Sequence, residues 1–527
     1  MPSYVTLIRL SAGVVLLLAA FSIGPPASRA AQTGDATPER VAAAVSRLDA
    51  LVEEMLQRTG VPGMAVAVVY RDEVVYLKGF GVREAGTEAR VDADTVFQLA
   101  SLSKPVASTV VASVVGDGLL SWDDPIVEHE PSFAMHEPWV TSQVTVRDMF
   151  AHRSGLPDHA GDLLEDIGYN RDQILHRLRY YRPAYSLRAG YEYTNFGLTA
   201  GAEAAAEVAG ISWEDLSEER LYGPLGMTST SSRFADYAAR PNRALTHVLV
   251  DGRQVAKYTR DADAQAPAGG VSSSARDMAQ WLRLQLGYGT VDGRRIVDGD
   301  ALVETHRPQS TISQAPYPAT GRASFYGLGW NVSYDNAGRL RLGHSGAFAM
   351  GAGTTVYQVP EEQIGIVVLT NAEPRGAPEA VALSFLDLAI EGTLERDYLA
   401  LVGPVIESQL EPNYGTTVDY ASPPANPAPP LALSAYTGTY ANDLWGEIEV
   451  AEADGGLVLR TGPNKAPFAM RHWDRDTFLF QPTGENAFGP SGMMFEIGPD
   501  GRASGVTIEY FNIEQQGTFA RKGMVQP

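Results

Sequence analysis

The chain has 527 residues, of which 41 are Lys or Arg, 63 are Asp or Glu and none is Cys. The length predicts two to four domains, and an apolar fraction of 44% excludes a wholly disordered or fibrous chain. The lack of Cys excludes disulfides, thiolate nucleophiles and Cys-ligated metal centres, and the formal charge of −22 argues against a nucleic-acid partner that requires a net basic surface.

The first 30 residues have the features of an export signal. An apolar run over residues 10–23 ends at Pro25, and residues 28–30 offer small side chains at the two positions that a signal peptidase reads. The run is short for a bilayer span. We expect cleavage after Ala30, a periplasmic or secreted product, and no membrane span after cleavage. An uncleaved N-terminal anchor is the alternative.

Helical and strand patterns alternate from residue 37 to about residue 392. The middle, from about residue 100 to 300, is mostly helical, and strand patterns stand on both sides of it. This order predicts an α/β (α+β) fold, in which N- and C-terminal strands share one antiparallel sheet and the helical region is inserted. The expected elements outside the middle are a helix from Thr37 to Gly60, a hairpin over 64–70 and 74–80, strands over 327–332, 353–359 and 364–371, and a helix over 378–392.

A second domain follows a stiff linker. Residues 421–430 contain five Pro, so we expect an extended linker over 411–432 between a main domain at 31–410 and a domain at 433–527. Short alternating runs separated by turn residues predict an antiparallel β-barrel at 433–527. Four aromatic residues of this domain are expected to form its core, with a ligand cavity as the alternative: Trp445, Trp473, Tyr510 and Phe511.

Ser101 and Lys104 form the first pattern that carries chemistry. They stand three residues apart at the head of an apolar helical stretch, so on a helix they share one face. A Ser hydroxyl needs a base, and a Lys can be that base where burial lowers its pKa, whereas Arg stays protonated. Only five of the 41 basic residues are Lys, which makes Lys104 conspicuous. The spacing alone also fits a surface Lys in a first helical turn.

Two further patterns lie downstream. Tyr193 and Asn195 are two residues apart and point the same way if the segment is extended. The phenol can exchange protons, and the amide can orient a base or a substrate carbonyl. His344 stands two residues before Gly346 in a Gly-rich run, where small residues let a substrate backbone approach closely. Taken singly, these are also explained by an aromatic loop on the core and by a packed or surface His.

Taken together, the three patterns carry a family resemblance. S-x-x-K, then Y-x-N, then a basic residue two before Gly resembles the penicillin-recognising serine hydrolases, in the branch of class C β-lactamases, D-alanyl-D-alanine carboxypeptidases and D-aminopeptidases. The resemblance covers about 40–395, and the C-terminal part resembles, more faintly, the lipocalin-like barrel of some of these peptidases. Residues 149–157, 224–227 and 267–273 also look like the family.

By this resemblance, Ser101 attacks a carbonyl and forms an acyl-enzyme. Lys104 is the base, or it relays the proton to Tyr193, which would protonate the leaving group and later activate water. Asn195 would orient Lys104 or the substrate amide. The sequence leaves open which of Lys104 and Tyr193 is the base.

The resemblance also assigns the strand around His344. The backbone N–H groups of Ser101 and Ala347 would form the oxyanion hole, and Ser345 and Gly346 would bind substrate; no metal and no other cofactor is implied. The penicillin binders usually carry Lys where this chain has His344. Because a His is only partly protonated near neutral pH, we expect a weaker hold on a substrate carboxylate.

The sequence therefore predicts an exported serine hydrolase on small peptide, ester or β-lactam substrates. A peptidase or amidase on D-amino-acid-containing or cell-wall-type peptides fits best. The alternatives are a carboxylesterase or weak β-lactamase on the same site, or a non-catalytic penicillin-binding sensor. The C-terminal domain is also a candidate for homo-oligomerisation, peptidoglycan binding or capping of the active site.

Two rival sites are weighed against this one. Residues 343–347 are close to the G-x-S-x-G elbow that would make Ser345 the nucleophile, but such an elbow leads into a helix, whereas more strand pattern follows here. His152, Asp158 and His159 lie close together in sequence and form the candidate metal set, although no H-E-x-x-H motif is present.

Overall fold

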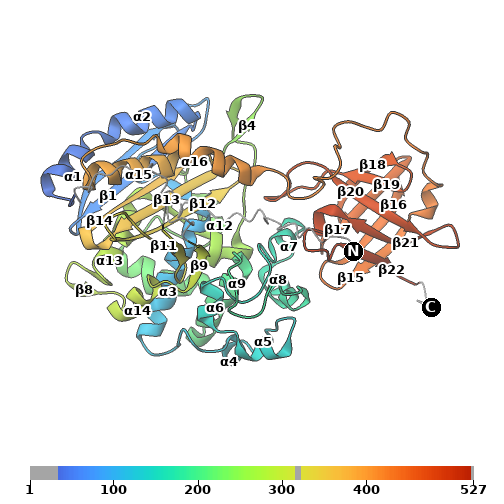
Figure 1. Cartoon of the computed structure of the whole chain (residues 1–527), viewed down its shortest axis with the longest axis horizontal. Coiled ribbons are helices and arrows are strands. Elements are labelled where there is room, and N and C mark those ends of the chain that lie inside the picture. Colours follow the sequence, from blue (N-terminus) through green and yellow to red (C-terminus); the bar gives the residue numbers. More distant parts are fainter. Residues whose placement is uncertain (1–33, 315–321, 524–527) are drawn as a thin grey trace, which may run out of the picture.

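The computed structural model describes residues 34–314 and 322–523, and it shows a sheet-and-helix domain joined to a closed barrel (Figure 1). The expected signal peptide, residues 1–30, lies outside the described residues. Within them, no helix is long and apolar enough to span a membrane.

The main sheet has eight antiparallel strands and joins the two ends of the first domain. Its order is β2-β1-β14-β13-β12-β11-β10-β9. β1 pairs directly with β14, with Met64 opposite Thr370, which confirms that N- and C-terminal strands share one sheet. The strands are β1 Gly63–Tyr70, β2 Glu73–Gly81, β9 Ser310–Ser313, β10 Ser324–Tyr326, β11 Asn331–Tyr334, β12 Leu340–Phe348, β13 Ala352–Val359 and β14 Ile364–Thr370.

Helices cover both faces of this sheet (Figure 1). α1 (Pro38–Val45), α2 (Leu48–Thr59), α15 (Ala377–Ile390) and α16 (Tyr398–Glu407) lie on one face, and α3 (Ser103–Gly116) and α13 (Ala275–Leu286) lie on the other. Along β1 the side chains alternate between the two cores, with Ala67 in one and Val68 in the other. Both faces of β1 and β14 are therefore buried, which explains why almost all of their residues are apolar.

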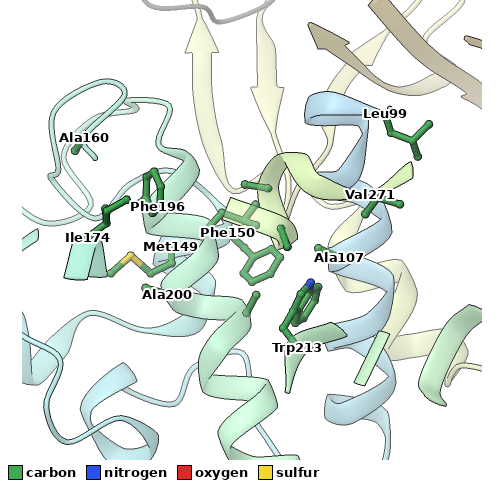
Figure 2. Packing of buried hydrophobic residues seen from close by; sticks show 14 of the residues in the cluster. Leu99, Ala107, Met149, Phe150, Ala160, Ile174, Phe196, Ala200, Trp213 and Val271 are labelled. Atoms are coloured by element: carbon green, nitrogen blue, oxygen red, sulfur yellow. The ribbon is translucent and has the colours of Figure 1, made fainter. Parts of the chain in front are cut away.

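The inserted helical region forms the rest of the first domain. Figure 2 shows Met149 and Phe150 of α6 packed near Phe196 of α9 and Trp213 of α10, where these helices meet. The shorter elements are α4 Ile126–His129, α5 Pro138–Gln143, α6 Val146–Phe150, α7 Asp162–Asp166, α8 Arg171–Arg177, α9 Asn195–Ala209, α10 Trp213–Ser217, α11 Gly223–Leu225, α12 Phe234–Ala239, α14 Gly299–Thr305, β3 Val96–Gln98, β4 Val248–Val250, β5 Arg253–Val255, β6 Ser272–Ser274, β7 Thr290–Val291 and β8 Arg294–Arg295.

Two expectations about elements need correction, and one helix was not expected. The first helix is two helices, because α1 ends at Val45 and α2 starts at Leu48. The run over 327–332 is mostly a turn between β10 and β11, since Gly329 has a positive φ of 80°. The sequence also missed α16, which follows α15 after a short break.

The C-terminal domain is a closed barrel of eight antiparallel strands, in which β15 pairs with both β16 and β22. Large side chains fill its interior, among them Tyr440, Phe478 and Phe495. The four aromatic residues expected in its core, Trp445, Trp473, Tyr510 and Phe511, are all buried. The strands are β15 Gly438–Asn442, β16 Gly446–Ala453, β17 Gly456–Thr461, β18 Ala466–Asp474, β19 Thr477–Phe480, β20 Ser491–Ile497, β21 Ala503–Ile508 and β22 Thr518–Arg521.

Candidate active site

Ser101 lies in a strained turn at the start of α3. The turn is a single 3₁₀ stretch, Ala100–Leu102, and Ala100 has a positive φ of 49°. A hydrogen bond ties this turn to the sheet, since the Thr354 hydroxyl on β13 donates to the Leu99 carbonyl at 2.6 Å. A non-Gly residue with positive φ costs free energy, so the tertiary contacts must impose this conformation.

β12 packs directly against the Ser101 turn through Gly346. A Cβ on Gly346 would stand 2.0 Å from the Leu99 carbonyl oxygen and 2.8 Å from the Leu102 nitrogen. Only Gly permits so close an approach of two backbones. Gly346 therefore sets the distance between the His344 strand and the turn that carries Ser101.

Lys104 is completely buried next to Ser101. Its Nζ lies 3.0 Å from the Ser101 Oγ, 2.6 Å from the Asn195 Oδ1 and 2.9 Å from the Ala268 carbonyl oxygen. Burial lowers the pKa of Lys104 to about 7, although the nearby Asp162 carboxylate acts in the opposite direction. A Lys with such a pKa is often neutral near pH 7 and can accept a proton.

Asn195 links Lys104 to a buried carboxylate. It is the first residue of α9, and its Nδ2 donates to the Asp162 Oδ2 at 2.8 Å while its Oδ1 accepts from Lys104. His159 Nδ1 lies 2.6 Å from the same Asp162 oxygen. The amide orientation is thus fixed from both ends, and it comes from the start of a helix rather than from the extended segment that the spacing suggested.

Tyr193 covers the other side of the Lys104 ammonium group. Its ring centre lies 4.5 Å from the Lys104 Nζ, and its side chain is hydrogen-bonded to Ser101. Burial raises the pKa of Tyr193 well above its usual value, whereas the bond to Ser101 lowers it. The His152 ring packs 4.6 Å from the Tyr193 ring. Tyr193 is therefore a neutral phenol, and its hydroxyl can donate a proton.

His344 is buried and fully engaged in hydrogen bonds. Its Nδ1 donates to the Ser345 carbonyl at 2.7 Å, and the Tyr326 hydroxyl donates to its Nε2 at 2.9 Å. Burial, together with the charge of Lys104, lowers the pKa of His344 to about 3. The imidazole is therefore neutral across the physiological range and offers no cation at this place in the strand.

The side chain of Ser345 lies on the opposite side of the sheet from His344. Its Oγ is 2.8 Å from the Thr355 Oγ1 on β13, and it also bonds to Glu379 of α15. The expectation that Ser345 and Gly346 bind substrate stays a prediction, and this placement leaves the Ser345 backbone rather than its hydroxyl for that contact. β12 continues to Phe348 and turns back as β13, so the strand-to-helix elbow that would make Ser345 a nucleophile is absent at this position.

The candidate metal set does not converge on one point. His152 accepts a hydrogen bond from the Thr194 backbone N–H through its Nδ1, while His159 pairs with Asp162. Within 34–314 and 322–523, no three His, Asp or Glu side chains are grouped so that they could hold a metal ion.

The geometry thus assembles Ser101, Lys104, Tyr193, Asn195 and His344 at one place. Sequence reasoning missed three groups that hold them in position: Asp162, Tyr326 and the Ala268 carbonyl. Ala268 lies in the 267–273 stretch, which resembles the family. The other two gave no signal in the sequence, because their importance comes only from long-range hydrogen bonds.

Comparisons with known proteins show the family of this chain. A family model described as Beta-lactamase matches residues 48–390, and one described as a domain of unknown function (DUF3471) matches residues 422–521. The chain therefore belongs to the Beta-lactamase family of serine hydrolases and penicillin-binding proteins.

The similar curated proteins are distant. "Unguisins hydrolase ungD" of Aspergillus violaceofuscus is 24% identical over 77% of this chain and 76% of its own length. "Penicillin-binding protein 4" of Amycolatopsis lactamdurans is 27% identical over 72% and 93%. "D-alanyl-D-alanine-carboxypeptidase/endopeptidase AmpH" of Escherichia coli strain K12 is 24% identical over 62% and 84%.

A solved structure shares the fold. The octameric penicillin-binding protein homologue from Pyrococcus abyssi superposes with a TM-score of 0.58 at 18% identity, covering 90% of this chain and all of that chain. This likeness concerns the fold of the protein and says nothing of its substrate.

Proposed function

We propose that this protein is an exported serine hydrolase that forms an acyl-enzyme on Ser101. The observation that carries the proposal is the buried Lys104 Nζ, 3.0 Å from the Ser101 Oγ and held by Asn195 and the Ala268 carbonyl. In the first step the Ser101 oxygen bonds to the substrate carbonyl carbon and its proton passes to Lys104. The backbone N–H groups of Ser101 and Ala347 hold the oxyanion, and one such donor contributes about 3–4 kcal/mol.

The second half of the cycle uses Tyr193. The acyl carbon–leaving group bond breaks as the Tyr193 hydroxyl gives its proton to the leaving amine or alcohol, and Lys104 returns a proton to Tyr193. Water then attacks the acyl-enzyme and the same groups move its protons in reverse order. The neutral-range pKa of Lys104 and the raised pKa of Tyr193 favour Lys104 as the base in acylation.

The neutral His344 restricts the substrate. A site that binds a terminal carboxylate needs a fixed cation, and His344 is uncharged with both ring nitrogens engaged. We therefore favour amide or peptide bonds that have no free carboxylate beside them, in D-amino-acid-containing or cell-wall-type peptides. One relative is named as a D-alanyl-D-alanine-carboxypeptidase/endopeptidase, which supports peptide-type chemistry.

A substrate panel tests this proposal. D-amino acid amides, D-Ala-D-Ala peptides, short p-nitrophenyl esters and nitrocefin are assayed with the natural chain and with Ser101→Ala. We expect the amides to give the highest kcat/KM and the variant to lose all activity. Fastest turnover of nitrocefin would contradict our interpretation of His344.

The same residues also allow two alternative functions. A carboxylesterase would prefer the p-nitrophenyl esters in the panel, and a non-catalytic sensor would form no Ser101-dependent adduct with a fluorophosphonate or a fluorescent penicillin. Export is tested by N-terminal sequencing of the product, which should begin at Ala31. Self-association through the C-terminal domain is tested by light scattering.

A further inference from the structure

The barrel contacts the first domain at the end of α7, the short helix that begins with Asp162. Its last residue, Asp166, accepts hydrogen bonds from the barrel through both carboxylate oxygens. The Glu485 N–H donates to Oδ1 at 2.8 Å, and the Asn486 N–H, the Asn486 Nδ2 and the Tyr510 hydroxyl donate to Oδ2 at 3.0, 3.0 and 2.9 Å. One end of α7 thus holds Asn195 and the other end holds the barrel.

The same barrel loop also contacts the hairpin that follows the His344 strand. The Glu485 carboxylate accepts hydrogen bonds from the backbone N–H groups of Ala349 and Met350, the latter at 3.3 Å. These residues form the turn between β12 and β13, two and three positions after Ala347. Glu485 therefore holds the strand that would supply an oxyanion-hole N–H.

Three glycines show that the barrel loops are shaped for this contact. A Cβ on Gly484 would stand 2.3 Å from the Asp166 Cγ, one on Gly462 would stand 1.9 Å from the Ile167 carbonyl oxygen, and one on Gly446 would stand 2.4 Å from the Tyr169 hydroxyl. All three have positive φ values, which other residues rarely adopt. Any side chain at these positions would push the barrel away from α7.

The charge of Arg260 explains how several carboxyl groups can be buried together at the contact between the barrel and the first domain. Arg260 pairs with Glu165, and its guanidinium lies over the Phe348 ring beside the hairpin turn. The Arg260 charge lowers the pKa of Glu485, but burial raises it further, to about 8. Burial also raises the pKa values of Asp166 and Glu165. Arg260 therefore compensates the negative charge that these buried carboxyl groups carry when they are ionised.

We propose that Glu485 is a positioning residue for the reaction at Ser101. Through its loop it connects α7, which holds Asn195, to the β12–β13 turn that follows Ala347, and so it fixes the distance between these two parts of the site. The contacts form a closed ring from Lys104 through Asn195 and α7 to Asp166, then through the barrel loop to the β12–β13 turn and back along β12 to the Ser101 turn. This inference rests on the proposed function, and it gives the C-terminal domain a part in catalysis that does not require contact with substrate.

The test compares Glu485→Ala, Glu485→Gln and a matched control, Glu496→Gln, whose side chain is exposed on β20 of the same barrel. Two reactions are measured, namely acylation of Ser101 by a small fluorophosphonate and kcat and KM for the small ester p-nitrophenyl acetate. A thermal melt checks that each variant is folded.

We expect Glu485→Ala to slow acylation and lower kcat for the small ester about 10- to 100-fold with little change in KM, because the oxyanion strand shifts. Glu485→Gln should recover part of this loss, since its Oε1 can still accept one of the two N–H groups, and Glu496→Gln should equal the natural chain. If Glu485→Ala does not fold, Glu485→Gln and Asp166→Asn carry the test with the same expected direction.

A Glu485→Ala variant that acylates at the natural rate would overturn the inference while leaving the proposed function intact. So would a Glu485→Ala variant that raises KM for p-nitrophenyl acetate and leaves kcat unchanged, because that would make Glu485 a substrate contact. A natural chain that is not labelled at Ser101 at all would instead overturn the proposed function, and the inference would fall with it.

Discussion

The Lys104 Nζ lies 3.0 Å from the Ser101 Oγ, in a side chain with no solvent exposure. Asn195 and the Ala268 carbonyl hold the same nitrogen, so its position is fixed before any substrate binds. Such preorganisation activates a weak nucleophile, because the base already lies within hydrogen-bond distance of it. The arrangement makes the removable proton of Lys104 the feature on which activity depends.

Lys104→Arg should abolish most of the activity. The guanidinium preserves the positive charge but does not release its proton, so the general base is lost. We expect kcat/KM to fall about 10²- to 10⁴-fold. Steady-state assays with the best substrate of the panel measure this, with Lys78→Arg, an exposed residue paired with Asp49, as the control. Retention of more than a tenth of the activity would show that Lys104 is not the base.

The pH profile of acylation should report the pKa of Lys104. Only the neutral amine accepts the Ser101 proton, so kcat/KM rises with pH through a midpoint of about 7. The Asp162 carboxylate raises this pKa, and Asp162→Asn should therefore move the midpoint to lower pH while its oxygen can still accept from Asn195. A midpoint that stays in place or moves upward in Asp162→Asn would refute this assignment.

His344→Lys should create a preference for substrates with a free carboxylate. The natural imidazole has a pKa of about 3 and stays neutral, whereas a Lys at this position brings a cation to the strand. A charge-assisted hydrogen bond contributes about 1.5–3 kcal/mol, which corresponds to a tenfold or greater gain in relative kcat/KM. Paired assays of a D-Ala-D-Ala peptide and its C-terminal amide measure the ratio, and His344→Gln is the uncharged control. An unchanged ratio in His344→Lys would contradict the role given to the missing cation.

Gly346→Ala should damage both stability and activity. The added Cβ would meet the Leu99 carbonyl oxygen at 2.0 Å, so the strand must move away from the Ser101 turn. Overpacking of this kind costs about 1–3 kcal/mol, visible as a lower Tm together with a lower acylation rate. Gly403→Ala is the matched control, because a Cβ there would meet no atom closer than 3.9 Å. A normal rate in Gly346→Ala would show that the strand position is not critical.

The sequence was sufficient for the residues whose chemistry is local. Ser101 and Lys104 stand one helical turn apart, and the scarcity of Lys made the pair visible. The hairpin of β1 and β2 and the barrel were predictable for the same reason, since alternation and turn residues act over a few positions. The Beta-lactamase family match confirms the class that these motifs indicated.

The remaining parts depend on contacts between distant segments. Asp162, Tyr326 and Glu485 each gain their place from a partner more than 15 residues away, and an Asp, Tyr or Glu in a loop or short element has no distinctive pattern of its own. The direction of the Ser345 side chain could not be predicted for a related reason. Which face of a strand meets the active site depends on the pairing of β12 with β13 and on the packing of α15.

The most direct test of the account is intact-mass and peptide mass spectrometry after reaction with a fluorophosphonate. We predict one adduct on the natural chain, located on the peptide that contains Ser101, and no adduct on Ser101→Ala under the same conditions. An adduct that persists in Ser101→Ala, or one located on Ser345, would contradict the central claim that Ser101 is the nucleophile.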